Sequence, residues 1–481
     1  MAITALALSL LVAQPVDDVA SPDAGAPASR DVEGPTAVEA PEVDDASVEV
    51  STPAPAVTTS SEPSTPPATI DRAEPPPAES SKGPYKAWKD PVQLELGSFV
   101  PGKGFYIGTK DERFTMRIHG RVQVRYDIDH PGNGGNTHQT LQVRRARVVL
   151  GGNVFSKYVH YYLQLGFSPR DQIAGVPNEN GTMRRTPLRD ARLEFDRIRD
   201  FTVWAGQMKV PFSRQRVVSS SSLNLVDRSI ANDEFQLDRD IGVQVLSKDV
   251  GGLGWLGYNA GVFLGEGRNV WEQSDFGMLY VARLEATPLG KFEDYSEGDL
   301  DRNEKPKLAI GGAYAFQNKS HYTNGTWGDP PADRGTTDVH NATADVILKW
   351  RGLSAQSAFH FRQSTNRRNG GAVDEETMMP IATALPRDGV GWFAQIGWLV
   401  PKIPLEVVGR YGLVRNIRGA DRSALVWRDE VGGGLNYYAY GHWVKLQLDY
   451  FRLYGADQGP TYASAARHGN DRIRLQLQVS F

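Results

Sequence analysis

Apolar and polar residues alternate in segments of roughly ten residues from Phe114 to the end of the chain. In the first segment, "FTMRIHGRVQVRYDI", the apolar side chains share one face, and Arg117, Arg121 and Arg125 lie on the other. The last segment, "RIRLQLQVSF", keeps the same alternation to its final residue. A period of two residues is that of a β-strand, whose successive side chains point to opposite faces. The pattern predicts sixteen strands, near 114–128, 140–152, 158–168, 188–196, 200–207, 239–247, 256–264, 278–287, 307–316, 340–350, 353–363, 391–400, 404–414, 430–439, 443–453 and 472–481.

The connections between these strands alternate between short and long. Short ones include 196–200, 351–353 and 401–404, and long ones include 209–238, 288–306, 317–339, 364–389 and 454–470. An even number of strands with short turns and long loops is typical of outer-membrane barrels. The segments approach the ~9–11 residues that a tilted strand needs to cross a bilayer, and a sheet in lipid has to close on itself. We therefore predict an all-β fold, a 16-stranded antiparallel transmembrane β-barrel over residues 114–481. The alternative is a large soluble β-protein of the cell surface.

Two further features favour the membrane barrel. Full charges occur in mid-strand on the non-apolar face, which suits a water-filled interior. Aromatic residues gather near strand ends, where interfacial girdles need them: Tyr158, Tyr161, Trp350, Trp392, Trp398, Tyr437, Trp443 and Tyr450.

The first 84 residues differ from the rest in composition. They carry 14 acidic and 3 basic side chains, whereas the remainder carries 43 acidic and 50 basic ones. Residues 15–84 are mainly Pro, Ala, Ser, Thr, Asp and Glu, and such a segment cannot bury enough apolar surface to offset its ordering entropy. We expect a disordered acidic tether over 15–84, followed by a lead-in segment over 85–113. Residues 1–14 have an apolar core without a basic n-region, so they are interpreted as a signal peptide, with a disordered apolar N-terminus as the alternative.

Composition and motifs argue against several functions. The chain contains no cysteine, which excludes disulfides and Cys-ligated metals. No run of about 18 apolar residues that would form a transmembrane helix occurs. No G-x-S-x-G, P-loop, H-E-x-x-H or His-rich cluster occurs, so we expect neither an enzyme nor a bound metal or cofactor. A barrel hydrolase with a Ser–His pair within about 3.2 Å is the enzymatic alternative. The basic residues lack an aromatic platform, so a nucleic-acid partner is not expected.

The face assigned to the barrel interior carries many cations. Strands 1, 2 and 16 are neighbours in a closed barrel, and their inward positions form one wall of arginines: Arg117, Arg121, Arg125, Arg145, Arg147, Arg472 and Arg474. Arg144 has the opposite parity, which indicates either the membrane rim or a β-bulge. Guanidinium groups bind phosphate or carboxylate through two parallel hydrogen bonds, and rings of Arg or Lys give anion pores their selectivity. The residues leave two interpretations open, an anion pathway and ion pairs that brace a wide barrel.

The long segment 209–238 mixes apolar and polar residues and lacks the Gly- and Asn-rich composition of a free surface loop. We expect it to fold into the barrel and narrow the pore, with Lys209, Arg214, Arg216 and Arg228 nearest the constriction. An ordinary structured surface loop is the alternative.

Several segments together resemble one family: "FTMRIHGRVQVRYD", "LQVRRARVVLGG", "LRDARLEFD", "VWAGQMKVPFSRQ" followed by "LVDRSIAND", and "DRDIGVQV". They are similar to the phosphate-selective porins O and P of Gram-negative outer membranes, from about residue 100 to the C-terminus and most densely over 114–247. The resemblance implies a homotrimeric 16-stranded porin whose third loop folds inward and whose arginine ladder guides anions.

The resemblance also implies roles for individual residues. The paired arginines of the second strand correspond to Arg144 and Arg145, and the loop arginine before serine corresponds to Arg228. Lys209 is the nearest match to the central lysines of the family. The acidic residue that usually follows the Pro–Phe pair is not evident, because Arg214 and Arg216 stand there.

The terminal aromatic residue, Phe481, resembles the signal that the barrel-assembly machinery reads. Together these features predict an outer-membrane porin whose water-filled channel prefers phosphate or other small anions. It would be surrounded by outer-membrane lipid, with its N-terminal tether in the periplasm. The alternatives are a general small-solute porin and a structural barrel without phosphate selectivity.

Overall fold

The computed structural model describes residues 94–100, 104–132, 135–177, 183–272, 275–292, 295–326, 328, 330–417, 427–455 and 469–481. Of the two compact units into which the chain divides, Ala87–Phe481 contains this whole described fold. The predicted signal peptide (1–14) and tether (15–84) lie outside the described residues.

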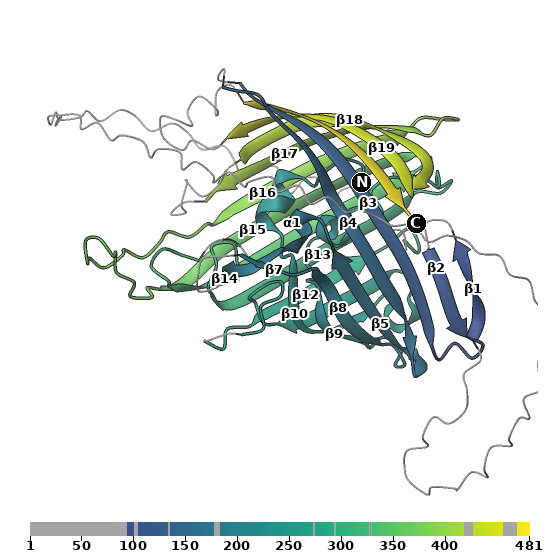
Figure 1. Cartoon of the computed structure of the whole chain (residues 1–481), viewed down its shortest axis with the longest axis horizontal. Coiled ribbons are helices and arrows are strands. Elements are labelled where there is room, and N and C mark those ends of the chain that lie inside the picture. The colour runs from purple at the N-terminus through teal and green to yellow at the C-terminus, as the bar shows by residue number, and fades with distance from the viewer. Residues whose placement is uncertain are drawn as a thin grey trace, which may run out of the picture. The chain divides into compact units, whose positions relative to one another are not determined.

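Sixteen antiparallel strands form a closed barrel (Figure 1). The ring closes between β20 and β3, from Ser480 opposite Arg121 to Asn470 opposite Pro131, so the first and last barrel strands lie side by side. The strands in ring order are β3 (Thr115–Pro131), β4 (His138–Val154), β5 (Ser156–Gly166), β8 (Leu188–Phe195), β9 (Thr202–Lys209), β10 (Arg239–Ser247), β11 (Leu256–Phe263), β12 (Leu279–Ala286), β13 (Lys307–Ser320), β14 (Thr336–Trp350), β15 (Leu353–Arg368), β16 (Gly389–Leu399), β17 (Leu405–Asn416), β18 (Trp427–His442), β19 (Val444–Gly455) and β20 (Asn470–Ser480). All sixteen predicted strands are confirmed.

The two faces of the wall follow the predicted alternation. On β20 the outward Leu475 and Leu477 are exposed, whereas the inward Gln476 and Gln478 are buried. Antiparallel pairing around a closed ring satisfies the backbone amides that lipid could not.

The predicted lead-in segment contains a hairpin of β1 (Leu94–Val100) and β2 (Gly104–Thr109). β2 pairs with the start of β3, from Gly108 opposite Thr115 to Phe105 opposite Ile118. It therefore continues the edge of β3 beyond the point where β20 ends. A second small hairpin, β6 (Ile173–Pro177) with β7 (Met183–Arg185), lies in the connection between β5 and β8.

The helices are short: α1 (Pro169–Gln172), α2 (Arg214–Val217), α3 (Ile230–Phe235) and the 3-10 turn η1 (Val250–Gly252). In the part of the chain that the structure describes, no helix is long and apolar enough to cross a bilayer.

One connection lies at the end of the barrel opposite to the expected one. Residues 287–306 join β12 to β13 at the same end as the short turns 196–201 and 351–352, which we call the short-turn end. The sequence had grouped 288–306 with the long loops, which mark the long-loop end. The connection is long, as predicted, but the alternation of short and long connections fails here, because strand order, and not loop length, fixes the end at which a connection lies.

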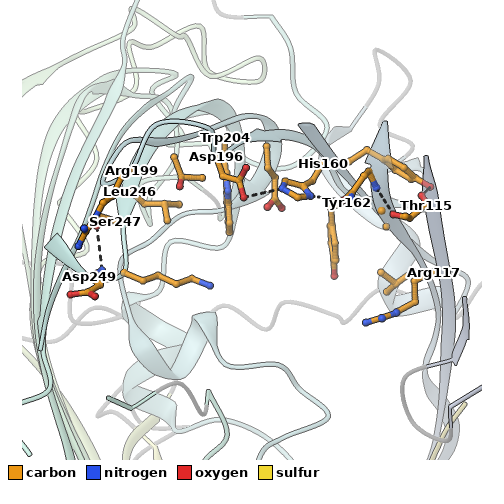
Figure 2. Close-up of a pocket in the computed structure, with 18 of the residues that line it drawn as sticks. Thr115, Arg117, His160, Tyr162, Asp196, Arg199, Trp204, Leu246, Ser247 and Asp249 are labelled. Carbon is orange, nitrogen blue, oxygen red and sulfur yellow. Dashed lines mark hydrogen bonds and ion pairs between the residues drawn. The ribbon is translucent and has the colours of Figure 1, made fainter. Parts of the chain in front are cut away.

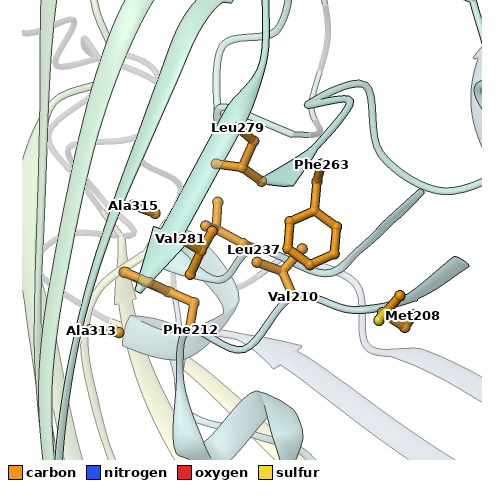
Figure 3. Packing of buried hydrophobic residues seen from close by; sticks show 9 residues of the cluster. All are labelled: Met208, Val210, Phe212, Leu237, Phe263, Leu279, Val281, Ala313 and Ala315. Carbon is orange, nitrogen blue, oxygen red and sulfur yellow. The ribbon is translucent and has the colours of Figure 1, made fainter. Parts of the chain in front are cut away.

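The connection between β9 and β10, residues 210–238 and here named loop L3, folds into the barrel as predicted. Near both ends of L3, Val210, Phe212 and Leu237 pack on the inner faces of β11–β13 (Figure 3). Phe235 and Leu225 pack in the same way on the inner faces of β15–β19. Burial of each such side chain contributes roughly 1.5–3 kcal/mol. Apolar patches on an otherwise polar lumen therefore hold L3 inside the barrel.

Candidate functional site

Loop L3 lies between two cavities of the lumen. The cavity toward the long-loop end has a volume of about 490 Å³ and is lined mainly by strands β3, β4 and β17–β20 and by L3. The cavity toward the short-turn end has a volume of about 830 Å³ and is lined mainly by β5, β8–β12 and L3. A third cavity, of about 840 Å³, lies at the short-turn mouth and contains Arg117, His160 and Asp196 (Figure 2).

A β-bulge in β4 explains why two consecutive arginines face the lumen. Gln123 of β3 pairs with Arg145, but the next residue, Val124, pairs with Val143. Arg144 is therefore the extra residue, and the side-chain parity changes across it. Of the two explanations for its parity, the bulge is confirmed.

Three arginines of the predicted wall and the bulge residue Arg144 converge on one carboxylate of L3, that of Asp227. Its oxygens lie 3.3 Å from Arg145 Nη2, 3.6 Å from Arg144 Nη2 and 3.5 Å from Arg474 Nη1, and Arg125 also pairs with it. Two of the four arginines have a second acidic partner, because Arg125 pairs with Asp127 and Arg474 pairs with Asp449. This part of the wall is thus largely ion-paired, as the bracing interpretation expected.

Arg121 and Arg147 meet L3 at its serine run. Arg121 donates to the Ser220 hydroxyl at 3.0 Å and to the Ser219 hydroxyl at 3.5 Å, and Arg147 donates to the Ser220 hydroxyl at 3.3 Å. Arg147 also forms a bidentate pair with Asp171, at 2.6 and 2.8 Å. Two guanidinium groups therefore share one hydroxyl at the edge of the cavity toward the short-turn end.

Lys209 and Arg228 approach the same backbone carbonyl from opposite sides of L3. The Lys209 ammonium donates to the carbonyls of Val217 at 2.8 Å and Val218 at 3.4 Å, and Arg228 Nη2 donates to that of Val218 at 2.7 Å. Lys209 lines the cavity toward the short-turn end, and Arg228 lines the one toward the long-loop end. These two cations connect the cavities across the loop.

The remaining predicted site residues lie elsewhere. Arg117 is at the short-turn mouth, and Arg472 is near the long-loop rim, where it pairs with Asp129 at 2.5 Å. Arg216 lines the cavity toward the long-loop end but is paired with Asp238. Arg214, in helix α2 of L3, is buried and pairs with Glu285 of β12 at 3.1 Å. The structure therefore brings Arg121, Arg125, Arg144, Arg145, Arg147, Arg474 and Lys209 to L3, which itself carries Arg228. Arg216 and Arg472 line the same cavity as Arg228, whereas Arg117 lies at the short-turn mouth and Arg214 is buried against β12.

Sequence reasoning missed the partners of these cations. Asp227 directly precedes the predicted Arg228, and Ser219 and Ser220 belong to a four-serine run, so both features were visible in the sequence. Asp171 lies in α1 of the loop between β5 and β8, and no periodicity indicated that this loop also turns inward. Only a three-dimensional arrangement joins these segments to the strand arginines.

The inward histidines hold structural positions. His360 lies fully buried between the rings of Phe212 and Phe235, at centroid distances of 6.5 and 6.2 Å. His160 is bonded to Asn153 at 2.7 Å and to Asp196 at 3.0 Å. Neither contact resembles the Ser–His pair that the hydrolase alternative requires.

A closed 16-stranded barrel with an apolar outer wall, a charged interior and an inward loop defines an outer-membrane porin. Residues 116–313 match the family described as phosphate-selective porin O and P. This match confirms, over that stretch, the resemblance seen in the sequence, and together with the barrel it places the protein in the outer membrane of a Gram-negative bacterium.

Solved structures with a similar fold are also outer-membrane barrels. They include the channel DcaP of Acinetobacter baumannii (13% identity, 76% of this chain and 97% of that chain, TM-score 0.46). They also include OmpF of Salmonella typhi (11%, 77% and 98%, TM-score 0.47) and OccK1 of Pseudomonas aeruginosa (11%, 76% and 98%, TM-score 0.38). No curated protein matches the chain. Likenesses this distant say nothing about the solute that passes through the barrel.

Proposed function

We propose that the protein is a porin whose water-filled channel prefers anions and admits phosphate or other small anions by diffusion. The observation that carries this proposal is the state of Arg121, Lys209 and Arg228. Their hydrogen bonds go to hydroxyl and carbonyl oxygens, and none of the three has a carboxylate partner among the described residues. Neutral partners orient a cation without cancelling its charge, so these groups attract an anion at L3.

The chemistry of the group suits phosphate. Guanidinium groups recognise its oxygens through paired hydrogen bonds. Arg121 and Arg147 donate to the same hydroxyl, so an anion near Ser220 would meet two guanidinium groups together. The family resemblance points the same way. It also supports a homotrimer and recognition of Phe481 by the assembly machinery, which we include in the proposal.

The second candidate is a general small-solute porin with little anion preference. The convergence of four arginines on Asp227 favours it, because ion-paired guanidinium groups have less charge to offer a solute. The two candidates differ in one measurable property, the ratio of anion to cation permeability.

Single-channel recording of the full chain in planar bilayers tests the proposal. We expect channels that carry chloride, and we expect added phosphate to reduce the chloride current because it occupies the same cations. Arg228→Gln should weaken this block, whereas Lys305→Gln, which removes an exposed cation outside the lumen, should leave it unchanged. A channel that prefers cations, or the lack of any channel, would contradict the proposal.

A further inference from the structure

Another segment enters the lumen, from the end opposite to the long loops. Residues 295–299 of the connection between β12 and β13 reach L3, where the Glu297 amide donates to the Ser222 carbonyl at 3.0 Å. Asp299 accepts from the Gly352 amide at 2.7 Å, and Lys349 donates to the Ser296 hydroxyl at 2.8 Å. The segment is thus fixed to the barrel wall on one side and to L3 on the other.

The Glu297 carboxylate is the centre of this contact. Its Oε1 accepts from Gln215 Nε2 at 3.2 Å, and its Oε2 accepts from the Asn224 amide at 2.9 Å and from Gln395 Nε2 at 3.1 Å. The residue is 2% exposed. A buried carboxylate is costly unless hydrogen bonds satisfy it, and these three donors come from two parts of L3 and from β16.

Gln215 connects Glu297 to the part of L3 that carries Arg228. Its Oε1 accepts from the Ser229 hydroxyl at 2.8 Å and from the Ser229 amide at 3.2 Å. Its backbone carbonyl accepts from Arg228 Nε at 2.7 Å. Because its side-chain nitrogen is held by Glu297, the Gln215 side chain has one orientation in which its oxygen accepts both bonds from Ser229, the residue that follows Arg228.

We propose that Glu297 is a positioning residue for anion selectivity, which sets the place of Arg228 through Gln215. This inference rests on the proposed function, because Arg228 is one of its three neutral-partnered cations. Glu297 itself does not touch the solute. Loss of its positioning role should lower the anion preference, whereas loss of its negative charge alone should raise it. The two effects have opposite signs, so the proposal can be tested.

The decisive variant is Glu297→Gln. Removal of a negative charge from the lumen would by itself raise anion preference. However, the new amide nitrogen would face the Gln215 nitrogen or the Asn224 amide, so one donor would oppose another. We expect Gln215 to rotate, Arg228 to lose its fixed place, and phosphate to block the chloride current roughly three- to tenfold more weakly, as loss of about one intramolecular hydrogen bond predicts.

A swap of the two side chains supplies the rescue. In Gln215→Glu with Glu297→Gln, the amide at 297 donates to the carboxylate at 215, and the remaining oxygens accept from Ser229, Asn224 and Gln395 as before. The net charge equals that of the wild type. We expect Gln215→Glu alone to weaken phosphate block and the double variant to restore it. Asp301→Asn, at an exposed acid of the same connection, is the control and should behave as the wild type.

Wild type and variants are compared by phosphate block and by thermal unfolding. Weaker block in Glu297→Gln with recovery in the double variant supports the proposal. Unchanged or stronger block in Glu297→Gln, or no recovery, overturns it even if the wild-type channel prefers anions. If Glu297→Gln does not fold, Gln215→Ala breaks the same chain while Glu297 keeps its two other donors. Unchanged block in that variant also overturns the proposal.

Discussion

Replacement of Asp227 by Asn tests whether the arginines that converge on it face the ion pathway. The change keeps the shape of the side chain and removes the charge that Arg125, Arg144, Arg145 and Arg474 share. The cavity toward the long-loop end is lined by nine arginines and five acidic residues, so the substitution raises its formal charge from +4 to +5.

The size of the effect follows from Coulomb's law. An ion that passes about 7 Å from position 227, in a water-like dielectric of ~80, changes in energy by about 0.6 kcal/mol per unit charge. Salt at about 0.1 M has a Debye length of about 10 Å and roughly halves this energy, to about 0.3 kcal/mol. Anions gain and cations lose this amount, so the ratio of anion to cation permeability should rise about threefold.

The assay is the reversal potential of single channels under a salt gradient. Asp301→Asn makes the same charge change at an exposed site and should leave the ratio unchanged. At about 1 M salt the Debye length is about 3 Å, so the difference between Asp227→Asn and wild type should vanish. An unchanged or lower ratio at low salt would refute the reasoning, because the released arginines would then not face the ions.

Three other predictions concern separate parts of the barrel. Arg145→Glu combined with Arg228→Glu should lower the anion preference while the barrel stays folded, and an unchanged reversal potential would mean that both groups only brace the wall. Gly120→Val should reduce the yield of folded barrel on gels, because a Cβ at this position would lie 2.5 Å from the ring of the last residue; a normal yield would show that the ring moves aside. The pKa of His321 is raised because its ring is hydrogen-bonded to Glu266. This contact should stabilise the two loops that it joins and so protect their backbone amides from hydrogen exchange. The protection should be complete below about pH 6.5, the pKa of a free histidine, and it should be lost as pH rises through the raised pKa. Hydrogen exchange corrected for intrinsic rates checks this, and pH-independent protection would contradict it.

The alternation of side chains was sufficient to predict the barrel. Its period is a local property, so all sixteen strands could be found from the sequence. It also located the irregularity at Arg144, because a residue whose parity disagrees with both neighbouring segments is what a bulge produces. Inward apolar residues such as Phe263 and Val281 break the polar pattern of the lumen. They could have shown which part of the wall L3 covers.

The contacts of the site could not be predicted in the same way. Asp227 meets four arginines only because L3 crosses the lumen, and the path of a loop has no periodic signature. The inward turn of residues 295–299 was hidden for a further reason, since its length suggested a loop of the other end. The sequence therefore assigned these cations to the inner face of the wall and left their partners open. In the function that we propose, these partners decide which of the cations keep their charge for a solute.

The central claim is that cations with neutral partners at L3 make this porin prefer anions. The reversal potential of the wild-type channel, measured in a KCl gradient at low salt, tests it most directly. We expect a potential with the sign of chloride permeation, and a shift toward zero when Arg121, Lys209 and Arg228 are together replaced by Gln. A wild-type potential of zero, or one with the sign of potassium permeation, would contradict it.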